Sequence, residues 1–334
     1  MRSEDQLVTR ITRALASGPG ASCTALRLGV GDDAAIVASM GRAHWALSCD
    51  AFLEDVHFLA KLHPADSVGY KSLVRATSDL VAMGATPRFF LMTLALPATR
   101  QGAWLDRFLR GMTQASRRLG MELIGGDTSI SPRVSISITV LGDTPPATIL
   151  TRAGARPGDI IYVAGQLGRA QLGLELVLEG FGRRRRLARL LRQHLYPELE
   201  ADLGSWLARH RVASAMIDVS DGLSTDLSRL CAASRVGAYV EMDRIPRVEI
   251  PGTLLRQLRH LRLDPLRMAL HGGEDYTLLF TVSRSKLRQL RGAPGFSRLT
   301  SIGEIARAKQ VRLVTSDGRS KPLVPAGWDP FRTR

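Results

Sequence analysis

The sequence predicts an α/β protein of two domains, residues 1–145 and 146–334, with mixed sheets flanked by helices. The chain has 334 residues, 45% of them hydrophobic, which is enough for two cores. Short strand-like apolar runs alternate with segments whose apolar residues repeat at helical spacing. The proline pair Pro145-Pro146, in a linker predicted over residues 142–147, separates the two sets of elements.

The elements predicted in the first half include neighbouring strands, so we expect no strict alternation of strand and helix. A helix carrying Val8, Ile11 and Leu15 is predicted to end at Gly18-Pro19-Gly20. The other predicted elements are strands over 34–38 and 45–49, a helix over 65–84, a strand over 88–96, a helix over 104–119, and strands over 121–124 and 134–141.

The second half has a similar mixture of predicted elements. Strands are predicted over 159–164, 215–219, 239–242 and 276–282, and helices over 172–180, 187–195 and 223–234.

Composition argues against several classes of protein. The longest apolar runs, such as 160–164 and 276–282, are far shorter than the roughly 20 residues of a membrane-spanning helix. The N-terminal segment is polar and acidic, with no apolar signal region behind it. Cys23, Cys49 and Cys231 are widely spaced and odd in number, which fits neither a disulfide framework nor a zinc site. We therefore expect a cytoplasmic protein without a membrane segment.

The net charge of +15 at pH 7 raises the question of a nucleic-acid partner. The excess is uneven, because residues 1–150 have a net charge of +2 and residues 151–334 a net charge of +13. Only five of the 46 cationic residues are lysine, and no aromatic residues interleave with the densest arginine run, at 183–186. We expect no specific nucleic-acid partner.

Carboxylates gather in short strings rich in glycine and serine. These strings are Gly31-Asp32-Asp33, Ser48-Cys49-Asp50, Ser78-Asp79, Gly125-Gly126-Asp127-Thr128, Asp218-Val219-Ser220-Asp221-Gly222 and Gly272-Gly273-Glu274-Asp275. Most follow or precede an apolar strand, so we expect them at strand ends, where binding sites collect. Hard oxygen ligands without a histidine or cysteine cluster favour Mg²⁺ or Ca²⁺ over zinc. Because Mg²⁺ is commonly shared with substrate phosphates, the strings together predict a nucleotide site with several metal ions.

Each string taken alone also has a structural explanation. A single Gly-Asp pair is usually a turn. Ser220 and Asp221 are suited to cap the helix over 223–234, and Asp79 lies in mid-helix, where burial would require a partner. The number of such strings in a chain of positive net charge is what favours a shared metal site.

Familiar phosphate-binding and nucleophilic motifs are absent from the sequence. It has no P-loop string, no protein-kinase set of motifs and no Gly-x-Ser-x-Gly nucleophile elbow. Cys49 has no histidine placed beside it by sequence.

Taken in order along nearly the whole chain, the strings resemble the thiamine-monophosphate kinases, of the superfamily that includes aminoimidazole ribonucleotide synthetase and selenophosphate synthetase. Besides the acidic strings, the likeness includes His57-Phe58 and Thr151-Arg152-Ala153-Gly154-Ala155-Arg156-Pro157-Gly158-Asp159. The Gly272-Gly273-Glu274-Asp275-Tyr276 string and the terminal Gly327-Trp328-Asp329 distinguish the kinase from its relatives. The resemblance implies the two-domain aminoimidazole ribonucleotide synthetase-like fold.

The resemblance also implies an activity, a set of site residues and an assembly. The activity is phosphorylation of thiamine monophosphate to thiamine diphosphate, with ATP as co-substrate and Mg²⁺, in a homodimer built through the N-terminal domains. The implied magnesium ligands are Asp33, Ser48, Cys49, Asp50, Asp79, Asp127, Asp218 and Asp221. The implied ATP contacts are Gly126, Asp127, Arg152 and Ser220, and the implied thiamine-phosphate contacts are His57, Glu274 and Trp328. Of these residues, Asp50, Asp127 and Arg152 are expected to be catalytic.

Two segments depart from the family pattern. The family commonly has Ser-Thr-Asp at Ser48-Cys49-Asp50, and a thiol is a poor Mg²⁺ ligand, so a contact at this position requires backbone oxygen. The family commonly has His-Leu-Arg-Pro-x-Pro-Arg at His194-Leu195-Tyr196-Pro197-Glu198-Leu199-Glu200, which lacks both arginines here. We assign no role to that segment.

The implied chemistry agrees with the residues present. The acceptor is a phosphate monoester with a second pKa of about 6, so it is largely dianionic at neutral pH and direct transfer needs no general base. Mg²⁺ ions and Arg152 would offset the repulsion between the two anions. Trp328 is suited to stack on the cationic acceptor ring.

Two alternatives remain open from the sequence. One is another ATP-using enzyme of the superfamily, acting on selenide or an amide; selenide chemistry usually brings a reactive cysteine or selenocysteine near the N-terminus, and Cys23 lies outside the glycine-rich strings. The other is a nucleotide- or nucleic-acid-binding protein without turnover, which would show salt-sensitive DNA binding and no ATP consumption.

Overall fold

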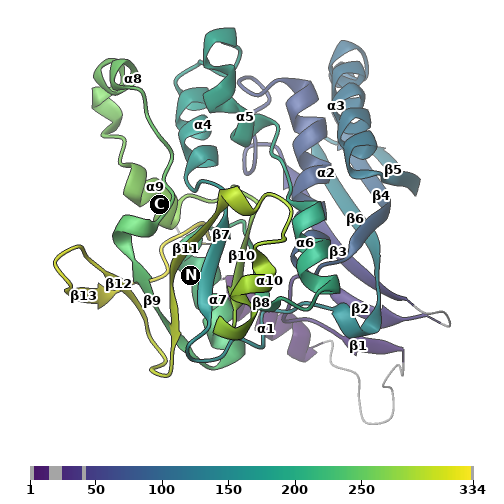
Figure 1. Ribbon diagram of the computed structural model, residues 1–334. Coiled ribbons are helices and arrows are strands. Elements are labelled where there is room, and N and C mark those ends of the chain that lie inside the picture. The colour runs from purple at the N-terminus through teal and green to yellow at the C-terminus, as the bar shows by residue number, and fades with distance from the viewer. Residues whose placement is uncertain (1–3, 15–24, 40–42, 332–334) are drawn as a thin grey trace.

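The computed structural model describes residues 4–14, 25–39 and 43–331. Cys23, Leu15 and the Gly18-Pro19-Gly20 helix end predicted above lie outside the described residues. Within them, the chain forms two mixed sheets, one from each half of the sequence, with helices packed around them (Figure 1). The expected fold class, mixed sheets flanked by helices, is therefore confirmed.

The first half forms a six-stranded sheet of order β1-β2-β3-β6-β4-β5. Only β4 and β5 pair in parallel among the strands described, and the other neighbours are antiparallel. The elements are α1 Glu4–Ala14, β1 Leu26–Leu28, β2 Ala35–Ala38, β3 His44–Leu53, α2 Ala65–Ala82, β4 Thr86–Leu96, α3 Ala103–Leu119, β5 Glu122–Ile130 and β6 Ser135–Thr144.

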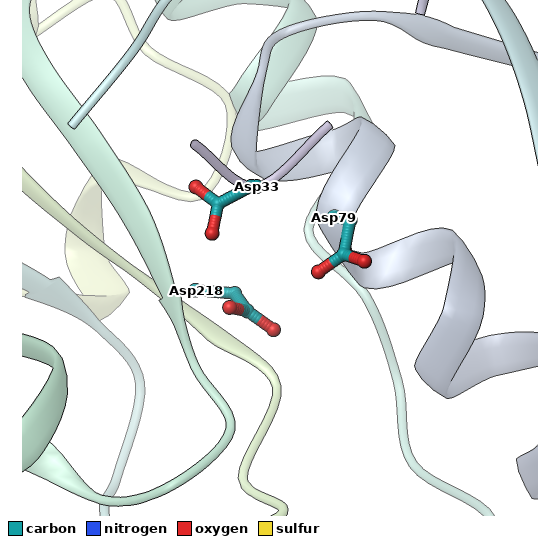
Figure 2. A group of neighbouring side chains, drawn as sticks. All are labelled: Asp33, Asp79 and Asp218. Carbon is teal, nitrogen blue, oxygen red and sulfur yellow. The ribbon is translucent and has the colours of Figure 1, made fainter. Parts of the chain in front are cut away.

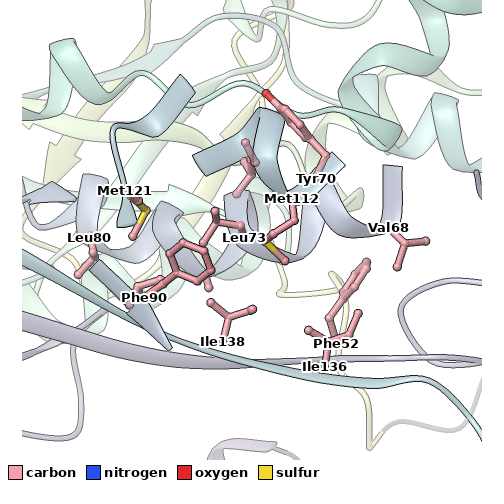
Figure 3. Close-up of a cluster of buried hydrophobic side chains, with 14 of the residues drawn as sticks. Phe52, Val68, Tyr70, Leu73, Leu80, Phe90, Met112, Met121, Ile136 and Ile138 are labelled. Carbon is pink, nitrogen blue, oxygen red and sulfur yellow. The ribbon is translucent and has the colours of Figure 1, made fainter. Parts of the chain in front are cut away.

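Helices α2 and α3 pack against one face of this sheet and close the first core. In α3 the buried residues are Phe108, Gly111, Met112 and Ala115, at the helical spacing expected of one apolar face. A Cβ added to Gly111 would lie 1.8 Å from the backbone oxygen of Asp66, so only glycine lets α3 approach α2 this closely. Figure 3 shows side chains of both helices meeting those of the sheet in this core.

The second half forms a seven-stranded sheet of order β13-β12-β9-β11-β7-β10-β8. Here β9 and β12 are the parallel pair among the strands described. The elements are β7 Ile160–Ala164, α4 Arg169–Leu178, α5 Ala188–Leu195, α6 Ala201–Arg209, β8 Ala213–Val219, α7 Leu223–Ser234, β9 Gly237–Glu241, α8 Gly252–Gln257, α9 Pro265–His271, β10 Thr277–Val282, α10 Leu287–Leu290, β11 Leu299–Ala306, β12 Val311–Val314 and β13 Ser320–Pro322.

Strand β10 is buried on both faces, which explains its continuous apolar sequence. Leu279 belongs to the core beneath α7, whereas Leu278 and Phe280 belong to the core beneath α6. Val81 and Ala82, at the end of α2, belong to the core beneath α6. Helix α2 therefore packs against both halves of the chain and is placed to carry a site between them.

Some predicted boundaries are wrong. The predicted linker over 142–147 begins too early, because β6 continues to Thr144 through its pairing with β3 and a short 3₁₀ turn follows at Pro146–Thr148. The strand predicted over 121–124 is too short, because pairing with β4 extends β5 to Ile130. Helices α6, α8, α9 and α10 and strands β1, β11, β12 and β13 were not predicted. No helix in the described ranges is both long and apolar enough to cross a membrane.

Candidate functional site

Three aspartates from separate parts of the chain meet at the boundary between the two halves. Asp33 precedes β2, Asp79 lies in the last turns of α2, and Asp218 lies near the end of β8. One carboxylate oxygen from each lies within 4.8 Å of the others, and the side chains point toward a common space (Figure 2). Three of the six acidic strings thus converge on one place.

Serine hydroxyl groups and one arginine surround the cluster. Ser48 Oγ donates to Asp79 Oδ2 at 2.5 Å, and Ser78 Oγ donates to Asp218 Oδ2 at 2.6 Å. Ser220 Oγ donates to Asp218 Oδ1 at 3.3 Å. Each carboxylate still has lone pairs that these hydroxyl groups do not use.

Asp33 and Arg152 form an ion pair across the two halves. Arg152 donates to Asp33 Oδ1 through Nη2 at 2.5 Å and through Nε at 3.1 Å, and its backbone N–H donates to Asp32. The other oxygen, Asp33 Oδ2, is buried and has no hydrogen-bond partner among the described residues. A buried carboxylate oxygen without a partner is costly, so this atom is well suited to bind a cation.

The electrostatics of the cluster also favour a cation. Burial raises the pKa of Asp33 to about 7, although Arg152 opposes this shift. Burial, followed by the charges of Asp218 and Asp50, raises the pKa of Asp79 well above its usual range. Burial likewise raises the pKa of Asp218. A divalent cation would stabilise all three carboxylates in their charged form, and an all-oxygen set of this kind suits Mg²⁺.

The loop around Asp221 is held by a residue that the sequence analysis missed. Capping of α7 by Ser220 or Asp221, the structural explanation considered for this string, is not found, because Gly222 is the N-cap and no side chain caps it. Instead, buried Asp226 in the first turn accepts hydrogen bonds from the backbone N–H groups of Asp221 and Gly222, both at 3.0 Å. Arg229 pairs with both Asp221 and Asp226. The only signal in the sequence was an acid one turn into a helix, which is ordinarily a surface feature.

Strand β3 directs its neighbouring residues to opposite faces of the first sheet. Ser48 and Asp50 lie on the face toward α2, where Asp50 Oδ2 accepts from Arg75 Nε at 3.0 Å. Cys49 is exposed on the other face, with the hydroxyl groups of Ser137 and Thr139 near its sulfur. The Cys49 thiol therefore points away from the acidic cluster, so any contact of Cys49 with a metal there would require its backbone oxygen.

The structure does not place Asp127 in the cluster. It lies within β5, an edge strand whose residues are all exposed, and it pairs with Thr93 of β4. The string containing it was expected at a strand end, but it lies inside a strand, as does the Ser48-Cys49-Asp50 string. Gly126 is required there, because its φ is 154° and an added Cβ would lie 1.9 Å from the backbone oxygen of Met92.

Glu274 is the centre of a buried polar network between the halves. Its Oε2 accepts from Lys71 Nζ at 2.7 Å and lies 3.3 Å from His194 Nδ1. His194 Nε2 in turn lies 2.9 Å from His63 Nε2. Burial alone would raise the pKa of Glu274, but Lys71 and then His194 outweigh it, so the pKa lies well below its usual range. Lys71, His63 and His194 are all buried, and no role was expected for any of them from the sequence.

His57 lies in the same neighbourhood. Its Nδ1 accepts from the backbone N–H of Leu53 at 3.0 Å, and its ring stacks on Phe52 with 5.7 Å between centroids. Burial, assisted by Arg75, lowers the pKa of His57 to about 4, while Glu274 and Asp50 act in the opposite direction. His57 is therefore neutral at pH 7.

The C-terminal segment returns to the acidic loop. The backbone N–H of Trp328 donates to the backbone oxygen of Asp221 at 3.0 Å. A Cβ added to Gly327 would lie 1.9 Å from that same oxygen, so the segment packs directly on the loop. This contact could not be predicted from the sequence, because Trp328 is far along the chain from each of the six acidic strings.

The fold and the site define a two-domain protein of the AIR synthase related class. Residues 31–144 match the family model of the AIR synthase related protein N-terminal domain, and residues 156–315 match that of the C-terminal domain. The chain is 34% identical over 313 residues to the thiamine-monophosphate kinase of Escherichia coli K12, which covers 92% of this chain and 93% of that protein. It belongs to the thiamine-monophosphate kinase family.

Solved structures agree with this assignment. The structure of AaThiL complexed with AMPPCP and TMP has a TM-score of 0.83 and 30% identity, and the match covers 99% of both chains. The thiamine-monophosphate kinase of Stenotrophomonas maltophilia K279a has a TM-score of 0.73 and 33% identity, covering 94% of this chain and 96% of that one.

Proposed function

We propose that the protein transfers the γ-phosphoryl group of ATP to thiamine monophosphate and forms thiamine diphosphate and ADP. The observation that carries this proposal is the meeting of Asp33, Asp79 and Asp218 beside Arg152, at a boundary that also holds Glu274. Family membership supports it, as does the solved relative complexed with AMPPCP, an ATP analogue, and TMP.

We propose that Mg²⁺ binds at the acidic cluster. Asp33, Asp79 and Asp218 would hold it, and the bound ion would supply the positive charge that neutralises the phosphates during transfer. The family resemblance also implies Asp50 and Asp221 as magnesium ligands. Here, however, Asp50 is paired with Arg75 and Asp221 is paired with Arg229. Either aspartate would therefore have to exchange an arginine for a metal ion in order to act as a ligand.

The chain's own residues have distinct tasks in this proposal. Arg152 is held by Asp33 and Asp32 and offers its guanidinium group to the triphosphate of ATP, with Ser220 and the Gly126-Asp127 segment as further nucleotide contacts. His57, Glu274 and Trp328 would contact the acceptor. His57 is neutral at pH 7 and the acceptor is a dianion, so no residue is needed to remove a proton before direct transfer.

We propose that the protein is a cytoplasmic homodimer formed through the first sheet. Edge strand β5 exposes Leu123, Ile124 and Ile130, with exposed fractions of 51%, 51% and 75%. An exposed apolar edge strand favours pairing with another chain, and the nearly neutral first half would repel its own copy less than the second half. Light scattering at micromolar concentration should report a dimer, and a monomer would contradict this part of the proposal.

Product analysis tests the proposed activity. The protein, Mg²⁺, ATP and thiamine monophosphate are mixed, and thiamine diphosphate and ADP are separated and measured. We expect equal amounts of both products, none after EDTA treatment, and loss of turnover in Asp33→Asn. ADP without thiamine diphosphate would show that another acceptor is used, and no nucleotide consumption would contradict an enzymatic function.

A further inference from the structure

Arg75 has no role in the mechanism above, yet it lies at the centre of the site. Helix α2 carries Lys71, Arg75 and Asp79 at intervals of four residues, which places them on one face of the helix. Lys71 pairs with Glu274 at one end of this row, and Asp79 joins Asp33 and Asp218 at the other. Arg75 is therefore between the proposed acceptor contact and the proposed metal site.

The guanidinium group of Arg75 is fixed in place. Its Nε donates to Asp50 Oδ2 at 3.0 Å, and its Cζ lies over the Phe52 ring, 5.5 Å from the centroid. Only 17% of the side chain is exposed. An aromatic face on one side and a carboxylate at Nε leave the group little freedom to rotate, so its two terminal nitrogens have a defined direction.

Those terminal nitrogens are available to a ligand. Among the residues that the structure describes, Nη1 and Nη2 of Arg75 have no hydrogen-bond acceptor, and neither is one of the fully buried polar atoms without a partner. They are therefore not fully buried, although Tyr276 and Glu274 lie close enough to act on the Arg75 charge. Two parallel N–H groups on a rigid guanidinium match two oxygens of a phosphate.

The surrounding charges indicate which phosphate binds there. Arg152 and the metal site account for the triphosphate of ATP, so the phosphate of the acceptor needs a separate cation. Glu274 is ionised and would repel a phosphate placed against it. Lys71 does not remove this repulsion, because it contacts only one oxygen of the Glu274 carboxylate. We propose that Arg75 binds the phosphate monoester of the acceptor, with that phosphate toward Asp79 and the acceptor ring toward Glu274. This inference rests on the proposed function.

The test compares two ligands that differ only in the phosphate. Calorimetric titration measures the affinities of thiamine monophosphate and of thiamine, each with Mg²⁺ and AMPPCP present, for the parent protein, Arg75→Gln and Arg75→Lys. Arg100→Gln is a matched control, because Arg100 also pairs with a carboxylate, Glu54, and lies over an aromatic ring, Trp104.

We expect Arg75→Gln to lose roughly 10- to 100-fold in affinity for thiamine monophosphate and to change less than about twofold for thiamine. Arg75→Lys should lose an intermediate amount, because an ammonium group makes a single contact where guanidinium makes two. Arg100→Gln should keep the parent's preference. If circular dichroism shows that Arg75→Gln is not folded, Arg75→Lys decides the test. We then expect the ratio of its affinity for thiamine monophosphate to its affinity for thiamine to fall by at least about threefold relative to the parent.

Two results would overturn the assignment: a ratio of affinities within threefold of the parent's, or an equal loss for both ligands. The product assay on the parent protein separates this outcome from failure of the proposed function. If the parent protein forms thiamine diphosphate but Arg75→Gln keeps the preference for thiamine monophosphate over thiamine, only the role of Arg75 is refuted. If the parent protein forms no thiamine diphosphate, the proposed function is refuted.

Discussion

The hydroxyl group of Ser78 on α2 donates a hydrogen bond to Asp218 Oδ2 on β8 at 2.6 Å, and this contact joins the two halves of the chain inside the acidic site. The next residue along the helix, Asp79, brings its carboxylate to the same cluster. Neither half holds the three aspartates alone, so the site exists only when both halves are docked.

Replacing Asp79 by asparagine should stabilise the metal-free protein while removing its response to Mg²⁺. The substitution keeps the shape of the side chain but removes a carboxyl group whose charged form is disfavoured by burial and by the neighbouring Asp218 and Asp50. Calorimetry with and without Mg²⁺ measures both effects, and turnover should fall by at least about 10²-fold. Asp66→Asn is a control on the same helix, because Asp66 accepts a hydrogen bond from the Tyr196 hydroxyl group and is not one of the three clustered aspartates. A normal Mg²⁺ response in Asp79→Asn would contradict the assignment.

Mg²⁺ should stabilise the protein more at pH 8 than at pH 6. Burial raises the pKa of Asp33 from 3.8 to about 7, so between these values the folded state binds more protons than the unfolded state. Metal-free stability contributed by this group therefore falls as the pH rises through that window. Mg²⁺ binds the deprotonated carboxylate, so its affinity should rise about tenfold from pH 6 to pH 8. A Mg²⁺ affinity that does not change over this range would count against Asp33 as a ligand.

Lys71→Met should destabilise the protein by about 3–5 kcal/mol, because it leaves the Glu274 carboxylate without its closest cation. Urea unfolding measures the change in free energy. The double variant Lys71→Met with Glu274→Gln should recover much of that loss, since it removes the unpaired charge. If the single variant loses less than about 1 kcal/mol, the Lys71–Glu274 pair does not contribute to stability as a buried ion pair would.

His57→Ala and Trp328→Ala should each raise the KM for thiamine monophosphate more than the KM for ATP. Loss of a stacked aromatic group should cost about 1–2 kcal/mol, or roughly 5- to 30-fold in affinity. Because the backbone of Trp328 contacts Asp221, Trp328→Phe is a control that keeps an aromatic ring at the same backbone position. Steady-state kinetics with each substrate varied in turn decides. If Trp328→Ala changed only the KM for ATP, the C-terminal segment would instead contact the nucleotide.

The long elements could be predicted from the sequence, because their periodicity is strong. Helix α2 was expected over 65–84 and is found over Ala65–Ala82, and α3 was expected over 104–119 and is found over Ala103–Leu119. Short elements such as α8 and β13 carry too few residues to show a period, and tertiary contacts determine them.

The residue types of the site could also be predicted, but their partners could not. The acidic strings marked Asp33, Asp79 and Asp218 as candidates, although only the docking of the halves brings them together. Lys71 and Arg75 were missed because a cation in a helix is ordinarily a solvent-facing residue, and here both face the boundary between the halves. Asp127 is the opposite case, since its string predicted a shared site and the structure leaves it on an exposed edge.

Crystals grown with Mn²⁺ and AMPPCP would test the central claim most directly, because anomalous scattering locates manganese without reference to the protein. We predict a manganese peak at coordination distance from oxygens of Asp33, Asp79 and Asp218, roughly 2.0–2.2 Å away, and loss of that peak in Asp79→Asn. Manganese bound to the nucleotide with none of these three carboxylates within coordination distance would contradict the account.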